Sequence, residues 1–198
     1  MKRFCLSDCG ATYGIGEYSQ SSHKKIYAAW FNMLSRCYDK NILQTHPSYQ
    51  GCSVCDQWLN FQVFAKWYEA QDAPEGWHVD KDIRKPGNKI YSPETCGLVP
   101  PEVNQLFVRQ KRIKNNGLPL GVSYKPRYTK QGVFTHNDIF ASCKDSTGKQ
   151  VHLGYFQSTS DAALAYKQFK TCIIHLLAEK YKHLLTQVMY NALINYHL

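Results

Sequence analysis

The sequence contains no long apolar run, and this absence excludes several classes of protein. No stretch approaches the roughly 20 apolar residues of a membrane-spanning helix, and residues 1–14 lack the apolar core of a secretory signal peptide. The motifs GxSxG and GxGxxG and the phosphate-binding loop of nucleotide hydrolases are also missing. We therefore expect a cytoplasmic protein without a membrane partner and without these catalytic arrangements.

Acidic residues are scarce in the second half of the chain. Residues 101–198 hold 13 lysines and arginines against 5 aspartates and glutamates, whereas residues 1–100 hold 11 against 10. Nearly all of the net charge of +9 therefore lies in the second half. Such a basic surface favours contact with the phosphates of a nucleic acid, although a solvated basic surface would give the same composition.

The chain has eight cysteines, which in a reducing compartment are thiols or metal ligands rather than disulfides. Cys52 and Cys55 have the two-residue spacing of a zinc knuckle, and Cys37 and Cys96 are candidates for the second pair. A structural zinc site on these four cysteines is one interpretation. Buried thiols in a small core explain them equally simply, so both interpretations stay open.

Hydrophobic periodicity predicts an α+β fold, with helices first and a sheet later. Apolar residues recur at helical spacing over 23–39 and again after Asp56, where an aromatic stripe is more typical of a core than of base stacking. Between 118 and 182, three extended runs precede a helix with a predicted N-cap at Ser160. The three runs are 121–124, 133–144 and 150–156.

The stretch from 118 to 182 resembles a known family of DNA-binding domains. The motifs that carry the resemblance are Gly121-Val122-Ser123, Phe140-Ala141, His152-Leu153-Gly154-Tyr155-Phe156 and Asp161-Ala162-Ala163-Leu164-Ala165-Tyr166. They are similar to the APETALA-two/ethylene-response-factor (ERF) domain. The resemblance implies a three-stranded antiparallel sheet in the major groove of double-stranded DNA, with the helix packed behind the sheet.

A second resemblance extends over most of the chain. It rests on Cys55-Asp56-Gln57-Trp58, Asp80-Lys81-Asp82, Gly87-Asn88 and Tyr91-Ser92-Pro93-Glu94-Thr95-Cys96. These motifs resemble a bacteriophage group that joins an HNH-like ββα-metal region to an ERF-type domain and is usually described as HNH or homing endonucleases. The resemblance implies a phage protein in the cytoplasm of a bacterial host, and a metal-dependent nicking or homing enzyme targeted by its ERF-type domain.

The HNH resemblance assigns roles to few residues. Asp80 and Asn104 match the ligands of Mg²⁺ or a similar divalent cation. Lys81 stands where the family has its general-base histidine, and a protonated lysine has no lone pair to accept a proton. In an extended strand His78, Asp80 and Asp82 share one face, so these three are the catalytic candidates. Pairing of the two aspartates with nearby basic residues is the alternative.

Residues expected to contact DNA lie in a basic linker and on one face of the sheet. The linker, 108–117, has four basic residues and no acidic one, which favours contact with the phosphate backbone over a solvated tether. The ERF resemblance implies that Ala141 lies toward the helix. Alternation within 133–144 then leaves His136, Phe140, Ser142 and Lys144 facing DNA. The family's base-reading Arg and Trp are replaced here, so its target sequence does not carry over. The candidates are Arg109, Lys111, Arg112 and Lys114 in the linker and Ser123, Lys125, Arg127, Tyr128, His136, Phe140, Ser142, Lys144 and His152 in the sheet and its first turn.

The sequence thus divides into five segments, and three functions stay open. The segments are an N-terminal arm (1–25), the HNH-like region (26–107), the basic linker (108–117), the ERF-type domain (118–182) and a helical tail (183–198). The first function is the metal-dependent endonuclease. The second is a catalytically decayed DNA-binding protein that acts as a regulator or anti-defence factor, and the third is an inhibitor whose basic face binds a protein partner. Lys81 is the residue that separates the first two. The sequence indicates neither the DNA site nor the oligomeric state.

Overall fold

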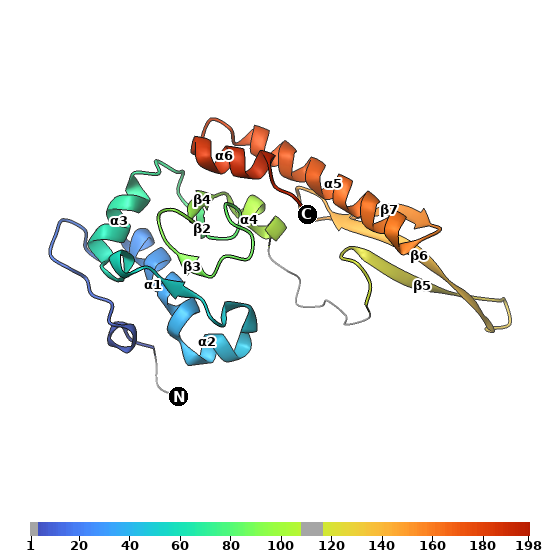
Figure 1. The fold of residues 1–198 in the computed structure, drawn as a ribbon, viewed down its shortest axis with the longest axis horizontal. Coiled ribbons are helices and arrows are strands. Elements are labelled where there is room, and N and C mark those ends of the chain that lie inside the picture. Colours follow the sequence, from blue (N-terminus) through green and yellow to red (C-terminus); the bar gives the residue numbers. More distant parts are fainter. Residues whose placement is uncertain (1–3, 108–116) are drawn as a thin grey trace. The chain divides into compact units, whose positions relative to one another are not determined.

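The computed structural model describes residues 4–107 and 117–198. It is 42% helical and 20% strand and contains a three-stranded antiparallel sheet, which confirms the α+β fold class (Figure 1). The chain divides into two compact units. Unit 1 contains residues 1–104 and 182–192, and unit 2 contains residues 105–181 and 193–198.

The first part of the chain, up to 107, combines helices with strands of two or three residues. Strand β1 pairs in parallel with β3, and β2 pairs antiparallel with β4. In chain order the elements are η1 (Leu6–Cys9), α1 (Lys24–Tyr38), α2 (Lys40–Thr45), η2 (Pro47–Tyr49), β1 (Ser53–Val54), η3 (Asp56–Leu59), α3 (Phe61–Glu69), β2 (His78–Asp80), β3 (Ile90–Tyr91), β4 (Gly97–Val99) and α4 (Pro101–Phe107).

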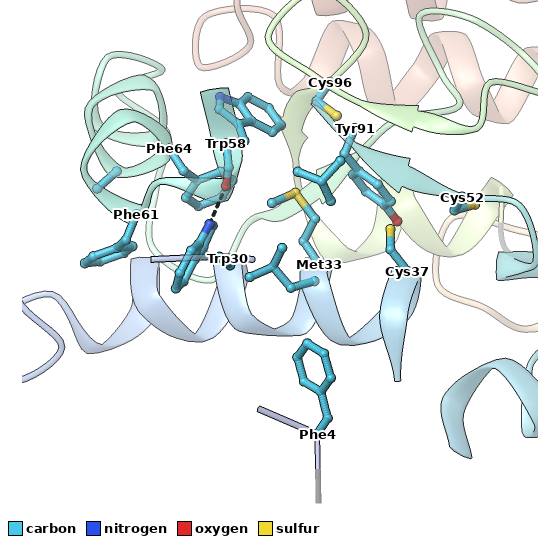
Figure 2. Close-up of a cluster of buried hydrophobic side chains, with 14 residues drawn as sticks. Phe4, Trp30, Met33, Cys37, Cys52, Trp58, Phe61, Phe64, Tyr91 and Cys96 are labelled. Atoms are coloured by element: carbon cyan, nitrogen blue, oxygen red, sulfur yellow. Dashed lines mark hydrogen bonds between the residues drawn. The ribbon is translucent and has the colours of Figure 1, made fainter. Parts of the chain in front are cut away.

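Aromatic side chains from α1, η3 and α3 form the core of unit 1 (Figure 2). Trp30, Trp58, Phe61 and Phe64 are each 0% exposed. The indole Nε1 of Trp30 donates a hydrogen bond to the carbonyl oxygen of Trp58 at 2.6 Å. The ring centroids of Trp30 and Phe61 are 5.3 Å apart. The aromatic stripe is therefore core, as the spacing predicts.

The helix predicted after Asp56 is divided into two pieces. Asp56 opens only the short turn η3, and α3 begins at Phe61. The side chain of Asn60 accepts a hydrogen bond from the backbone N–H of Gln62 at 2.9 Å, which provides a new N-cap inside the predicted helix. The division places Trp58 on η3 and Phe61 on α3, and both side chains lie in the same core.

Unit 2 is a three-stranded antiparallel sheet covered on one face by a long helix (Figure 1). The sheet order is β5-β6-β7. Val122, Ala141 and Ala162 form its buried core, and the small alanine side chains allow the helix to lie close to the sheet. The elements are β5 (Val122–Tyr128), β6 (Phe134–Lys144), β7 (Gln150–Phe156) and α5 (Thr159–Lys180).

The N-cap of α5 is Ser158, so the predicted cap at Ser160 is wrong by two residues. Ser158 Oγ accepts a hydrogen bond from the backbone N–H of Asp161 at 3.1 Å and donates one to its carboxylate at 2.8 Å. A cap needs an oxygen that reaches the amide three residues later, and Ser158 fulfils this condition with an acidic side chain in the first turn.

The tail forms a separate helix, α6 (Gln187–Ile194), after α5 ends at Lys180. Within unit 1, Met189 of α6 is 1% exposed and lies against Gly97 of β4. A Cβ atom at position 97 would overlap the sulfur atom of Met189. The tail thus contributes to a core. Within 4–107 and 117–198, no helix combines the length and the apolarity needed to cross a membrane.

Candidate functional site

The face of the sheet opposite α5 is where most of the predicted DNA-contacting residues lie. Ala141 and Cys143 are 0% and 3% exposed and point toward the helix side. Side chains alternate along a strand, so Phe140, Ser142 and Lys144 point to the other side. The parity prediction from Ala141 is confirmed by this burial pattern.

Strand register extends this face over all three strands, and we call it the open face. Residues that pair directly across antiparallel strands project on the same side. Ser123 pairs with Phe140, and Phe140 pairs with Tyr155. The open face consists of Ser123, Lys125 and Arg127 from β5, His136, Asp138, Phe140, Ser142 and Lys144 from β6, and His152 and Tyr155 from β7.

Tyr155 was missed by reasoning from the sequence because β7 is irregular. His152 and Tyr155 are three residues apart, and in a regular strand they would project on opposite sides. Between them the register shifts, so that Ala141 pairs with Gly154 while Ser142 pairs with His152. Gly154 has a φ of +127°, a conformation that favours glycine. A glycine inside a predicted strand is the sequence signal that indicates such a bulge.

Tyr155 is the centre of an aromatic and basic cluster. Its ring centroid lies 4.9 Å from that of His152 and 6.2 Å from that of Phe140. Lys125 Nζ donates a hydrogen bond to the Tyr155 hydroxyl at 3.2 Å. The guanidinium carbon of Arg127 lies 5.3 Å from the ring centroid, within the range of a cation–π contact.

Asp138 is the acidic residue of the open face. Its carboxylate accepts a hydrogen bond from Arg127 Nε and has a second contact, at 3.1 Å, with His136 Nε2. The hydrogen bond from Arg127 holds the pKa of Asp138 below its ordinary value, and the same bond raises the pKa of Arg127. Asp138 is therefore a carboxylate with two fixed partners on the face that carries the basic residues.

One predicted contact residue in the described part of the chain lies outside the open face. Tyr128 lies at the tip of the β5–β6 hairpin, 59% exposed, with its ring centroid 5.9 Å from that of Phe134. The four basic linker residues fall outside the described residues; they are Arg109, Lys111, Arg112 and Lys114.

The predicted HNH-like region contains two antiparallel strands followed by a helix. Strand β2 pairs with β4, with His78 opposite Val99 and Asp80 opposite Gly97, and α4 follows β4 directly. His78, at the start of β2, is exposed and its Nδ1 lies 3.1 Å from Asn104 Nδ2 on α4. The structure thus brings together His78 and Asn104 from opposite ends of the motif.

Asp80 is held by its own loop instead of pointing freely to solvent. One oxygen, Oδ1, accepts hydrogen bonds from the backbone N–H groups of Asp82 and Ile83, at 2.9 and 2.7 Å. The residue is 8% exposed, and burial raises its pKa despite these two hydrogen bonds. Asp82 is more exposed and forms an ion pair with Lys81 at 2.7 Å, so the structure shows the alternative of charge pairing for one of the two aspartates.

Lys81 fixes the loop between β2 and β3. It is 6% exposed, and its Nζ donates to Asp82 Oδ1 and to the carbonyl oxygen of Asn88, both at 2.7 Å. Asn88 returns a hydrogen bond to the carbonyl oxygen of Lys81 at 3.1 Å and donates another to Ile90 at 2.6 Å. At this position the lysine therefore holds the loop, and its Nζ is engaged as the donor of two hydrogen bonds.

The four cysteines considered for zinc lie in or beside the core of unit 1. Cys37, Cys52 and Cys96 are buried, and Cys55 is half-buried. Burial raises the pKa of Cys37 and of Cys96 to about 12, which keeps both as neutral thiols. Within the part of the chain that the structure describes, no three His, Cys, Asp or Glu side chains form a group that could hold a metal ion.

Comparison with known proteins identifies no relative for this chain. No protein-family model matches it, and searches of curated proteins and of solved structures gave no significant match. The two resemblances therefore depend on the motifs quoted above.

Proposed function

We propose that the protein binds double-stranded DNA through the open face of unit 2. The observation that carries the proposal is that three basic residues and three aromatic rings share the side of the sheet opposite α5. The basic residues are Lys125, Arg127 and Lys144, and the rings are those of Phe140, His152 and Tyr155. The resemblance to the ERF domain supports it, because that family places this face in the major groove.

The chemistry of the open face suits duplex DNA. Lysine and arginine neutralise phosphates and release counterions, and either side chain can also pair with guanine. Phe140 and Tyr155 provide flat apolar surface that can contact a thymine methyl group. A two-stranded β-ribbon fits the major groove, and other β-sheet proteins place strands in a groove, so residues of one face can reach the bases or the backbone together.

Replacing Lys125 with alanine should weaken binding to duplex DNA and lower its salt dependence. If Lys125 neutralises one phosphate, the slope of log Kd against log salt should decrease by about 0.9. The measurement is a titration of labelled duplex by fluorescence anisotropy at several salt concentrations. Lys167→Ala is the matched control, because this exposed lysine lies on α5 and the charge change is identical.

An equal loss in both lysine variants would mean that only total charge matters and would contradict a role for the open face. If the wild-type protein showed neither a gel shift nor a salt slope with duplex DNA, the proposal would fail. The interpretation as an inhibitor with a protein partner would then be favoured.

A second candidate function is metal-dependent cleavage of one DNA strand. The specific observation that favours it is the contact between His78 and Asn104 on the arrangement β2, β4 and α4. As oriented, Asn104 Nδ2 donates to His78 Nδ1; with the Asn104 amide turned over, its oxygen would accept from Nδ1–H, and Nε2 would carry the lone pair of a general base. His78 is therefore the candidate that replaces the histidine missing at position 81.

Asp80 and Asn104 offer oxygen donors of the kind that Mg²⁺ takes. Asp80 uses Oδ1 for its loop and keeps Oδ2, and the amide oxygen of Asn104 has a second lone pair beside the one that would accept from His78. When bound, such an ion would stabilise the leaving oxygen of the phosphodiester. The protein's own contribution would be to orient His78 through Asn104 and to hold Asp80 through the loop.

Replacing His78 with alanine should reduce DNA nicking by about 10²- to 10⁴-fold if His78 is the general base. The measurement is conversion of supercoiled plasmid to open circles with Mg²⁺, Mn²⁺ or EDTA. Asn104→Ala should also lose activity, and Asp80→Asn should lose it while the two loop hydrogen bonds to the side-chain oxygen are kept. His46→Ala, at an exposed histidine in another part of unit 1, should retain it.

If no metal supports nicking while the wild-type protein still binds duplex DNA, the cleavage candidate fails. The function is then that of a DNA-binding protein on a decayed nuclease scaffold, acting as a regulator or anti-defence factor.

A further inference from the structure

Arg127 is held from two sides on the open face. Its Nε donates to Asp138, and its guanidinium lies over the ring of Tyr155 at 5.3 Å. These partners come from the neighbouring strand β6 and from β7, so both other strands of the sheet fix the orientation of one side chain on β5. Arginine has many rotamers, and such fixation lowers the entropy that is lost on binding.

The hydrogen bond to Asp138 leaves the recognition edge of the guanidinium available. It uses Nε, whereas the two terminal nitrogens form the fork that pairs with O6 and N7 of guanine. The side chain of Arg127 is 43% exposed, so the fork is within reach of a ligand on the open face. The side chain of Asp138 is 20% exposed and is covered by its two partners.

Asp138 also requires an explanation for electrostatic reasons. A carboxylate on a surface that meets phosphates weakens non-specific binding, because like charges repel. Asp138 lies between two cations or potential cations, Arg127 and His136, and gives each a hydrogen bond acceptor. Asp138 is therefore placed to orient a base-reading arginine. Its negative charge also lowers the affinity for DNA of the wrong sequence.

We propose that Arg127 recognises one guanine in the DNA target and that Asp138 and Tyr155 are the positioning residues that aim it. This inference rests on the proposed function, because it requires that the open face meets duplex DNA. A simple surface ion pair would stabilise the hairpin slightly and would have no effect on sequence preference.

The first test defines the target and then removes one guanine acceptor at a time. The preferred sequence is selected from a random duplex library with the wild-type protein. Each guanine is then replaced by 7-deazaguanine, which lacks the N7 acceptor. We expect one position at which the wild-type protein loses roughly 5- to 150-fold in affinity. The Arg127→Ala variant should show no further loss at that position.

The second test separates positioning from charge. Asp138→Ala should bind random duplex as tightly as the wild-type protein or more tightly, because a negative charge is removed. It should lose most of the discrimination at the identified guanine, because Arg127 Nε loses its acceptor. Asp145→Ala is the matched control: it removes the same charge at the β6–β7 turn, where Asp145 accepts from the Thr147 and Lys149 amides. The control should leave the discrimination unchanged.

The outcomes distinguish this inference from the function on which it rests. Absence of duplex binding by the wild-type protein overturns both. Binding with no guanine preference, or with a preference that Asp138→Ala retains, overturns the inference alone. If Asp138→Ala does not fold, as checked by circular dichroism, Tyr155→Leu tests the other positioning residue, since the hydrogen bond from Arg127 to Asp138 is kept. Discrimination retained by Tyr155→Leu then overturns the inference.

Discussion

Replacing Trp30 with alanine should destabilise unit 1 by roughly 3–5 kcal/mol. The side chain is 0% exposed and packs against the ring of Phe61, with centroids 5.3 Å apart (Figure 2). The ring of Tyr27 lies on it as well, with a centroid distance of 5.9 Å. Loss of the Trp30 side chain would also leave the buried carbonyl of Trp58 without its indole donor. Since small domains are stable by only about 5–15 kcal/mol, a large fraction of the free energy of unfolding would be lost. Urea unfolding followed by circular dichroism measures the effect.

Two tryptophan-to-phenylalanine variants separate the hydrogen bond of Trp30 from its packing. Trp30→Phe removes the donor to Trp58, so it should cost about 1–3 kcal/mol beyond the loss of ring volume. Trp58→Phe removes an indole N–H that is buried and has no hydrogen-bond partner among the described residues, so this additional cost should be absent. Equal destabilisation would contradict the role given to the hydrogen bond. Ile15→Ala, at a fully exposed side chain, should have no effect.

Replacing Gly121 with alanine should destabilise unit 2 by roughly 2–5 kcal/mol through two causes. Gly121 has a φ of +80°, where a side chain costs about 1–2 kcal/mol. A Cβ atom there would also overlap the ring of Tyr166 on α5, and such overpacking adds about 1–3 kcal/mol. Tyr166 is 9% exposed and its ring has little room to move. The measurement is thermal unfolding, combined with duplex binding through the open face.

Gly148→Ala provides the matched control for Gly121→Ala. Gly148 has nearly the same backbone conformation, with a φ of +83°, and no atom lies within 4 Å of the position that an added methyl group would take. The Gly148→Ala variant should therefore show only the free-energy cost of a side chain at positive φ. Combining Gly121→Ala with Tyr166→Leu should recover part of the overpacking cost. If Gly121→Ala and Gly148→Ala destabilise the protein equally, the close approach of Gly121 to Tyr166 has no energetic importance.

Local patterns in the sequence were sufficient for several features of this protein. The helix at 24–38 and the three strands of unit 2 follow from side-chain spacing, because a helix and a strand repeat over short distances along the chain. Alternation divides the residues of β6 between the two faces of the sheet, and the ERF resemblance supplied the expectation that Ala141 faces the helix. The break at Asn60 and the cap at Ser158 were not predicted, because several polar residues near each helix start could have served as the cap.

Composition and short-range periodicity establish the α+β class, the basic second half and most of the residues on the open face. Which of these residues meet depends on the packed chain. The bulge at Gly154 brings Tyr155 to Arg127, and Asp138 reaches Arg127 from the neighbouring strand. Likewise, the pairing of β2 with β4 brings His78 to Asn104, 26 positions apart. Contacts between residues far apart in the chain depend on register and on packing, which no local pattern encodes.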